Sequence, residues 1–191
     1  HVAKTIWGLL KMFERDSISF GELEDRDLVD RVRYLGDAYM LGFKMYDDEK
    51  DEIAIKEIKD LNYYIFSLHM PSLDRKEYFK RYEELNIKDI YFSGRDWCLD
   101  YFERIYLRTG TKFDKYYLES EMGQKGLDIV RENTIGKGKG IFKESEGCIV
   151  YEGDPNKGLH TRVFVNREGL PTYEAKEIAL AFKKYEDINF D

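Results

Sequence analysis

Two side chains near the C-terminal end of this sequence have types and a spacing that suit the binding of a cation. Tyr173 and Glu177 stand four residues apart, and Thr172 before them can cap a helix, so we expect both side chains on one helix face. The dipole at a helix N-terminus favours an ionised carboxylate, which can hold a planar guanidinium through two parallel hydrogen bonds. The pair therefore predicts a guanidinium site, with arginine preferred over lysine.

The same spacing also fits an ordinary amphipathic helix. In that alternative Tyr173 packs on the core and Glu177 faces solvent, and a Tyr and a Glu four residues apart are common in helices. The spacing alone leaves both interpretations open.

The elements that must position this pair are predicted from periodicity. An alternating strand over 162–166 and a turn over 167–169 lead into the helix that starts at Tyr173. Apolar residues at helical spacing predict six further helices, and Gly36 and Gly42 in the second are expected to mark close helix packing. These helices are placed at 2–13, 25–46, 47–68, 74–85, 90–109 and 122–131. Short strands are expected at 113–118, 141–142 and 147–151. The fold class is thus a helix-rich mixture of α and β, either α+β or α/β.

Composition and charge exclude several classes of protein. The 191 residues carry a net charge of −7, which argues against neutralisation of a long nucleic acid by a basic surface. Cys98 and Cys148 lie far apart without metal-ligand spacing, so no metal site or disulfide framework is expected. No apolar run is long enough to span a membrane and no secretion signal is present, which favours a reducing cytoplasm.

Three other features are weaker candidates. The loop 136–140 alternates Gly and Lys but lacks the spacing of a phosphate-binding loop, so we expect a solvated loop. His69 and His160 have no partner in the sequence that would make them a general base or a metal ligand. We expect both histidines to be structural or exposed.

Three ordered segments resemble one enzyme family. Residues 144–150 read Glu-Ser-Glu-Gly-Cys-Ile-Val, residues 158–166 contain the strand above, and Thr172, Tyr173, Glu177 and Ala179 follow in register. Together they are similar to the catalytic domain of arginyl-tRNA synthetases. In that family the Tyr and the acid of the last segment contact the arginine substrate, so the resemblance implies that Tyr173 and Glu177 bind arginine.

The resemblance extends upstream with two departures. Phe113, Asp114 and Tyr117, followed by Glu119 and Ser120, are similar to a family segment that ends in Gly-Glu-Ser, which implies a secondary pocket role for Glu119 and Ser120. Residue 118 is Leu where the family has Gly, and residue 177 is Glu where most members have Asp. Residues 1–8 resemble the segment that follows the family's His-Ile-Gly-His signature.

Neither the His-Ile-Gly-His nor the Lys-Met-Ser-Lys-Ser signature occurs in the sequence. The resemblance therefore implies an internal fragment of a class I, Rossmann-like catalytic core with a large helical connective insertion. We expect a helical segment at 1–24, the connective block at 25–111 and a mixed part of the core at 112–191. His1 in place of an initiator Met is in line with a fragment.

The same resemblance implies the reaction partners. The intact enzyme would activate arginine with ATP and Mg²⁺ and charge tRNA, whereas the fragment would contain no catalytic residue, bind no cofactor tightly and be inactive alone. Its strands would expose edges that favour dimerisation. The alternative is a non-catalytic, acidic helical interaction module derived from a synthetase.

Overall fold

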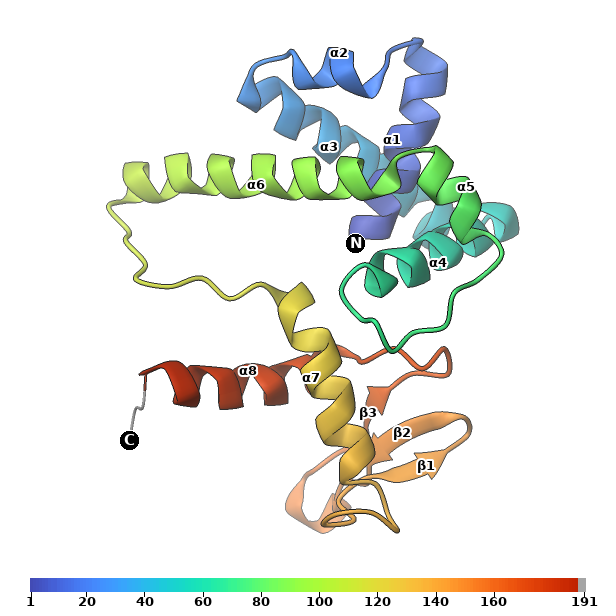
Figure 1. Ribbon diagram of the computed structural model, residues 1–191, viewed down its shortest axis with the longest axis vertical. Coiled ribbons are helices and arrows are strands. Elements are labelled where there is room, and N and C mark those ends of the chain that lie inside the picture. The colour runs from blue at the N-terminus through green and yellow to red at the C-terminus, as the bar shows by residue number, and fades with distance from the viewer. Residues whose placement is uncertain (189–191) are drawn as a thin grey trace. The chain divides into compact units, whose positions relative to one another are not determined.

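The structure is a computed structural model, and it describes residues 1–188. The chain forms two compact units (Figure 1). The first contains His1–Leu68 and Asp74–Asp114, and the second contains His69–Leu73 and the chain from Lys115 onward. Each unit has its own set of buried apolar side chains.

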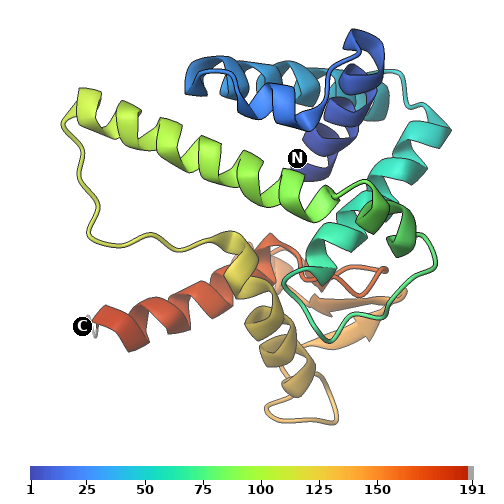
Figure 2. The same ribbon diagram turned by 45° about the horizontal axis from the view of Figure 1, so that its top comes forward.

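The first unit is helical, as its periodicity predicts. Its α-helices are α1 (Val2–Asp16), α2 (Phe20–Glu24), α3 (Leu28–Phe43), α4 (Glu52–Ser67), α5 (Phe79–Glu84) and α6 (Ile87–Thr109), and a π-helical turn, η1 (Lys44–Asp48), follows α3. In Figure 2 the long α6 lies across α1 and beside α3 within this unit, and α3 packs against both α1 and α6.

Side-chain caps decide where these helices begin. Asp27 accepts hydrogen bonds from the backbone N–H groups of the first turn of α3, and Asp51 caps α4 in the same way. The predicted helix starts at 25 and 47 are therefore wrong, because the acids at 47 and 48 lie in η1 and Asp51 is the cap. Ser19 and Glu22 form a reciprocal capping box that starts α2, a helix that the sequence prediction missed.

Two glycines allow α1 and α3 to touch backbone to backbone. A Cβ atom on Gly8 would lie 2.0 Å from the carbonyl oxygen of Ala38, and one on Gly42 would lie 2.2 Å from that of Lys4. Close packing at Gly42 is thus confirmed, whereas Gly36 has no atom within 4 Å of the position its Cβ would take. Large buried side chains fill the rest of this unit, among them Leu9, Leu23, Leu61 and Ile87.

The second unit combines two helices with a small sheet. Its elements are α7 (Glu119–Glu132), β1 (Lys143–Ser145), β2 (Cys148–Tyr151), a 3-10 turn η2 (Pro155–Lys157), β3 (Arg162–Val165) and α8 (Tyr173–Ile188). The strands pair in the order β1-β2-β3, and both pairings are antiparallel. The helix-rich α+β class is confirmed.

Three expectations about strands need correction. Residues 113–118 form no strand, since in the described part of the chain they pair with no other segment, and β propensity needs a partner strand to be realised. The strand expected at 141–142 begins instead at Lys143. A Rossmann-like core is built on parallel strands, and the three strands described here are antiparallel, so the structure does not support that part of the expected fold.

A close crossing of α7 and α8 organises the second unit. A Cβ atom on Gly126 would lie 2.5 Å from the carbonyl oxygen of Ala175, which sits in the first turn of α8. The short segment His69–Leu73 packs on α7 beside this crossing, with Met70 buried against Gly123 and the Ser72 hydroxyl donating to Gln124 at 2.8 Å. The start of α8 is thereby fixed against α7.

Candidate functional site

The turn between β3 and α8 determines where α8 starts. The side-chain oxygen of Asn166 accepts from the backbone N–H groups of Glu168 and Leu170, at 3.0 and 2.9 Å. The Thr172 hydroxyl donates to the carbonyl of Val163 at 2.7 Å, and the Thr172 carbonyl accepts from the N–H of Lys176 as the helix begins. The predicted helix start is confirmed, and the Thr172 side chain ties it to β3.

Tyr173 and Glu177 lie together on one face of the first turns of α8. The Tyr173 hydroxyl donates to the Glu177 carboxylate, and this hydrogen bond, followed by the negative charge of Glu177, raises the pKa of Tyr173 above its usual value. Tyr173 is 63% exposed, so the alternative in which it packs on the core is wrong. A phenol and a carboxylate converge in solvent, as their spacing predicts.

Glu119 reaches the same turn from the start of α7. It accepts from the Lys176 ammonium at 2.7 Å, and its charge together with that of Glu174 contributes to the raised pKa of Tyr173. The Lys176 side chain is only 12% exposed, while Glu119 is 63% exposed. Ser120 is half-buried in the first turn of α7, and no interaction described for residues 1–188 joins it to the other three.

The arrangement favours a cation. Three carboxylates surround one phenol, and the ammonium of Lys176 is already paired with Glu119. A hydroxyl that donates its proton to Glu177 still has lone pairs, so Tyr173 can accept from a ligand N–H while Glu177 accepts from a second. A planar group with parallel N–H donors suits these two acceptors.

The weaker candidates have structural roles or lie apart. Gly138 adopts a positive φ of 46° and its absent Cβ would meet the Glu132 carbonyl at 2.3 Å, so the loop 136–140 needs glycine there for its own conformation. Cys98 and Cys148 are free and half-buried. Among residues 1–188 no cluster of His, Cys, Asp and Glu is placed to hold a metal ion, and no helix in that range has the length and apolar character to cross a bilayer.

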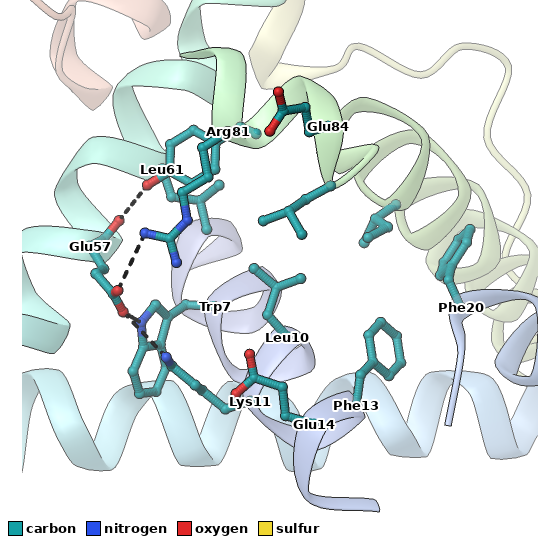
Figure 3. Close-up of a pocket in the computed structure, with 13 residues that line it drawn as sticks. Trp7, Leu10, Lys11, Phe13, Glu14, Phe20, Glu57, Leu61, Arg81 and Glu84 are labelled. Carbon is teal, nitrogen blue, oxygen red and sulfur yellow. Dashed lines mark hydrogen bonds and ion pairs between the residues drawn. The ribbon is translucent and has the colours of Figure 1, made fainter. Parts of the chain in front are cut away.

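The first unit contains a cavity that sequence reasoning did not find. It has a volume of about 440 Å³, and its lining comes from α1, α2, α4, α5 and the start of α6 (Figure 3). Glu57 stands at one side and accepts from the Trp7 indole N–H at 2.7 Å. Burial of Glu57 favours its protonated form, but the Trp7 hydrogen bond and the charges of Lys11 and Arg81 outweigh burial and lower the pKa of Glu57.

Comparison with known proteins finds arginine–tRNA ligases among the relatives of this chain. No family model matches the chain. An arginine–tRNA ligase of Treponema denticola is 27% identical over 192 residues, which covers 100% of this chain and 28% of that protein. An arginine–tRNA ligase of Treponema pallidum is 26% identical over 83% of the chain and 24% of its own length. A probable mitochondrial arginine–tRNA ligase of Bos taurus is 25% identical over 85% of the chain and 30% of its own length.

The resemblance to arginyl-tRNA synthetases is therefore confirmed along most of the chain. The chain spans less than a third of the length of each of these relatives.

Proposed function

We propose that this chain is part of an arginine–tRNA ligase in which Tyr173 and Glu177 bind the guanidinium group of arginine. The observation that carries the proposal is the contact between these two side chains at the start of α8, in a chain similar throughout to such ligases. The ligase as a whole would act in the cytoplasm on arginine, ATP and tRNA, with residues 25–111 as its connective block.

The two residues divide the recognition of the guanidinium. Glu177 is the charge partner and accepts from one or two N–H groups, while the Tyr173 oxygen accepts from another and its own O–H still donates to Glu177. A tyrosine phenol with the usual pKa of about 10 is protonated at neutral pH, and the raised pKa of Tyr173 retains this donor at still higher pH. Lysine has a compact ammonium that cannot make the parallel contacts, so arginine is preferred.

Glu119 and Lys176 position this pair. Lys176 neighbours Glu177 in sequence, and an unpaired ammonium there would repel the incoming cation. The ion pair with Glu119 neutralises Lys176 and also joins the starts of α7 and α8. Ser120 would have at most a secondary role in the pocket.

The described residues do not fit a site for Mg²⁺, because they contain no cluster of metal-ligating side chains. We therefore assign no step of the ATP chemistry to them. What this chain contributes is the binding and orientation of the amino acid, which accelerates a reaction by holding the reactants in place.

The test uses the complete reading frame that contains this chain. Arginine-dependent exchange of pyrophosphate into ATP is measured for the parent protein and for Tyr173→Phe and Glu177→Gln. Because hydrogen bonds to charged groups are worth more than neutral ones, we expect Glu177→Gln to raise the KM for arginine about 10- to 100-fold and Tyr173→Phe to raise it less. The KM for ATP should stay unchanged.

The matched controls are Tyr185→Phe, near the other end of α8, and Glu103→Gln, an exposed glutamate in the first unit, which make the same chemical changes outside the site. They should leave the KM for arginine unchanged. Full arginine affinity in the Tyr173→Phe, Glu177→Gln double variant would refute the site, and a parent protein without arginine-dependent exchange would favour the non-catalytic module. The isolated chain should form no arginyl adenylate.

A further inference from the structure

The cavity of the first unit is separate from the arginine site and is built around an apolar interior. Leu61 and Ile90 line it and are almost completely buried, at 1% and 4% exposed. Leu10, Phe13 and Phe20 add further apolar surface to the lining (Figure 3). Apolar walls with a few polar groups and a volume of about 440 Å³ are typical of sites for small molecules.

The cations on the lining already share a partner. Lys11 and Arg81 approach the two carboxylate oxygens of Glu57, at 3.5 and 3.7 Å. The Trp7 N–H is bonded to the same carboxylate, and the Tyr82 hydroxyl donates to the Glu57 backbone carbonyl at 3.3 Å. The polar groups on this wall are therefore satisfied by Glu57, and an anionic ligand would have to compete with it.

Two exposed carboxylates of the lining, Glu14 and Glu84, have few partners of their own. Glu14 is exposed and, among the described residues, has no recorded hydrogen bond or ion pair. Glu84 is 67% exposed and has only a long contact with Lys80, at 3.9 Å. Figure 3 shows these two carboxylates at opposite edges of the lining, with Leu10 between them in the view. A positive group at either of these edges would meet a carboxylate.

We propose that this cavity binds a small amphiphilic cation, with an apolar chain or ring on Leu10, Leu61 and Ile90 and an ammonium or guanidinium head group beside Glu14 or Glu84. The apolar part supplies most of the affinity, and the two carboxylates select the sign of the charge. The site lies within the first unit and does not depend on the proposed arginine site.

The test is isothermal titration calorimetry of the 191-residue chain with straight-chain alkylammonium ions of four to ten carbons, below their micelle concentrations. One ion should bind per chain, and affinity should rise by about fourfold for each added methylene until the cavity is full. Octanoate and octanol, which share the chain but not the charge, should bind at least tenfold more weakly than octylammonium.

Two variants locate the site. Glu14→Gln with Glu84→Gln should remove most of the preference for octylammonium over octanol, whereas Glu103→Gln, an exposed glutamate outside the lining, should leave it intact. Leu10→Trp should weaken all three ligands because the indole occupies the cavity. Octanoate binding as tightly as octylammonium, or no saturable binding of any ligand to the unaltered chain, would overturn the proposal.

Discussion

The two units join their helices by the same device and then stabilise them differently. Each has a crossing where glycine brings two backbones together, at Gly8 and Gly42 in the first unit and at Gly126 in the second. In the first unit a large set of buried aliphatic and aromatic residues surrounds the crossing. In the second unit, α8 buries only two of its side chains, Ala175 and Ala179. Ion pairs of Asp187 with Lys115 and of Glu186 with Lys125 hold the other end of that helix.

This difference separates two roles. Buried apolar surface makes the first unit stable and encloses a cavity, whereas backbone contact and charge position the exposed site on α8. The first unit should therefore respond most to changes of side-chain volume, whereas α8 in the second unit should respond to volume at its crossing with α7 and, to a smaller extent, to loss of charge at its other end. Three experiments test this contrast.

The largest effect is expected from Gly8→Ala. The new methyl group would fall 2.0 Å from the Ala38 carbonyl oxygen, so the α1–α3 crossing must open, at a cost of about 3 kcal/mol in the free energy of unfolding. Both tryptophans of the chain, Trp7 and Trp97, belong to the first unit, so urea unfolding followed by tryptophan fluorescence reports on that unit.

Gly36→Ala is the matched control for Gly8→Ala. The added methyl group meets nothing, so the better helix propensity of alanine should raise the free energy of unfolding by up to about 1 kcal/mol. Equal effects of the two substitutions would contradict a close crossing at Gly8.

A smaller effect is expected from Gly126→Ala in the second unit. Its methyl group would lie 2.5 Å from the Ala175 carbonyl oxygen, and we expect a loss of about 2 kcal/mol together with faster amide hydrogen exchange in the first turns of α8. Gly123→Ala should cost less, because its closest neighbour at 3.1 Å is the flexible Met70 side chain. Unchanged exchange around Tyr173 in Gly126→Ala would show that the crossing does not position the site.

The smallest effect is expected from Asp187→Asn. Hydrogen bonds from Lys115 and Lys183 hold the pKa of Asp187 well below its usual value. Such a group stabilises the folded state above its unfolded pKa of about 4, and this stabilisation is lost as pH falls through the lower folded value. The substitution should therefore lower stability at pH 7, and the difference from the unaltered chain should shrink below pH 4.

Hydrogen exchange in α8 at pH 7 and pH 3 measures this difference, and 1 M salt should reduce it at pH 7. Glu121→Gln, which removes an exposed acid with no described ion pair, is the control. If the difference in exchange between Asp187→Asn and the unaltered chain grew as the pH fell, an ionised Asp187 would not be what stabilises α8.

Local patterns predicted the elements that depend on local interactions. Helical spacing predicted α1 and α6, alternation predicted β3, and the four-residue spacing predicted that Tyr173 and Glu177 would converge. The spacing of Ser19 and Glu22 is that of a capping box, a sequence pattern that predicts the start of α2. Each of these features depends on residues within a few positions of one another.

Apart from the helix starts set by the caps Ser19, Asp27 and Asp51, the errors arose where residues far apart in the sequence determine the structure. Residues 113–118 have β-forming side chains but no partner strand among the described residues, and the cavity lining combines positions from 7 to 90 that no local pattern connects. The ion pair of Lys176 with Glu119 joins residues 57 positions apart in the chain and likewise depends on the α7–α8 crossing. Gly126 lies within a helical pattern, and nothing in the nearby sequence indicates that its backbone packs against Ala175 of α8.

The position of Met70 has a consequence for the order in which this chain can fold. The segment His69–Leu73 belongs to the second unit but precedes a long stretch of the first, and Met70 packs beside Gly123, roughly 50 residues later. During synthesis the thioether therefore leaves the ribosome well before its binding surface on α7 exists. The second unit must wait for the first to be nearly complete, and a piece expressed from Lys115 onward would lack one of the side chains that close its interior.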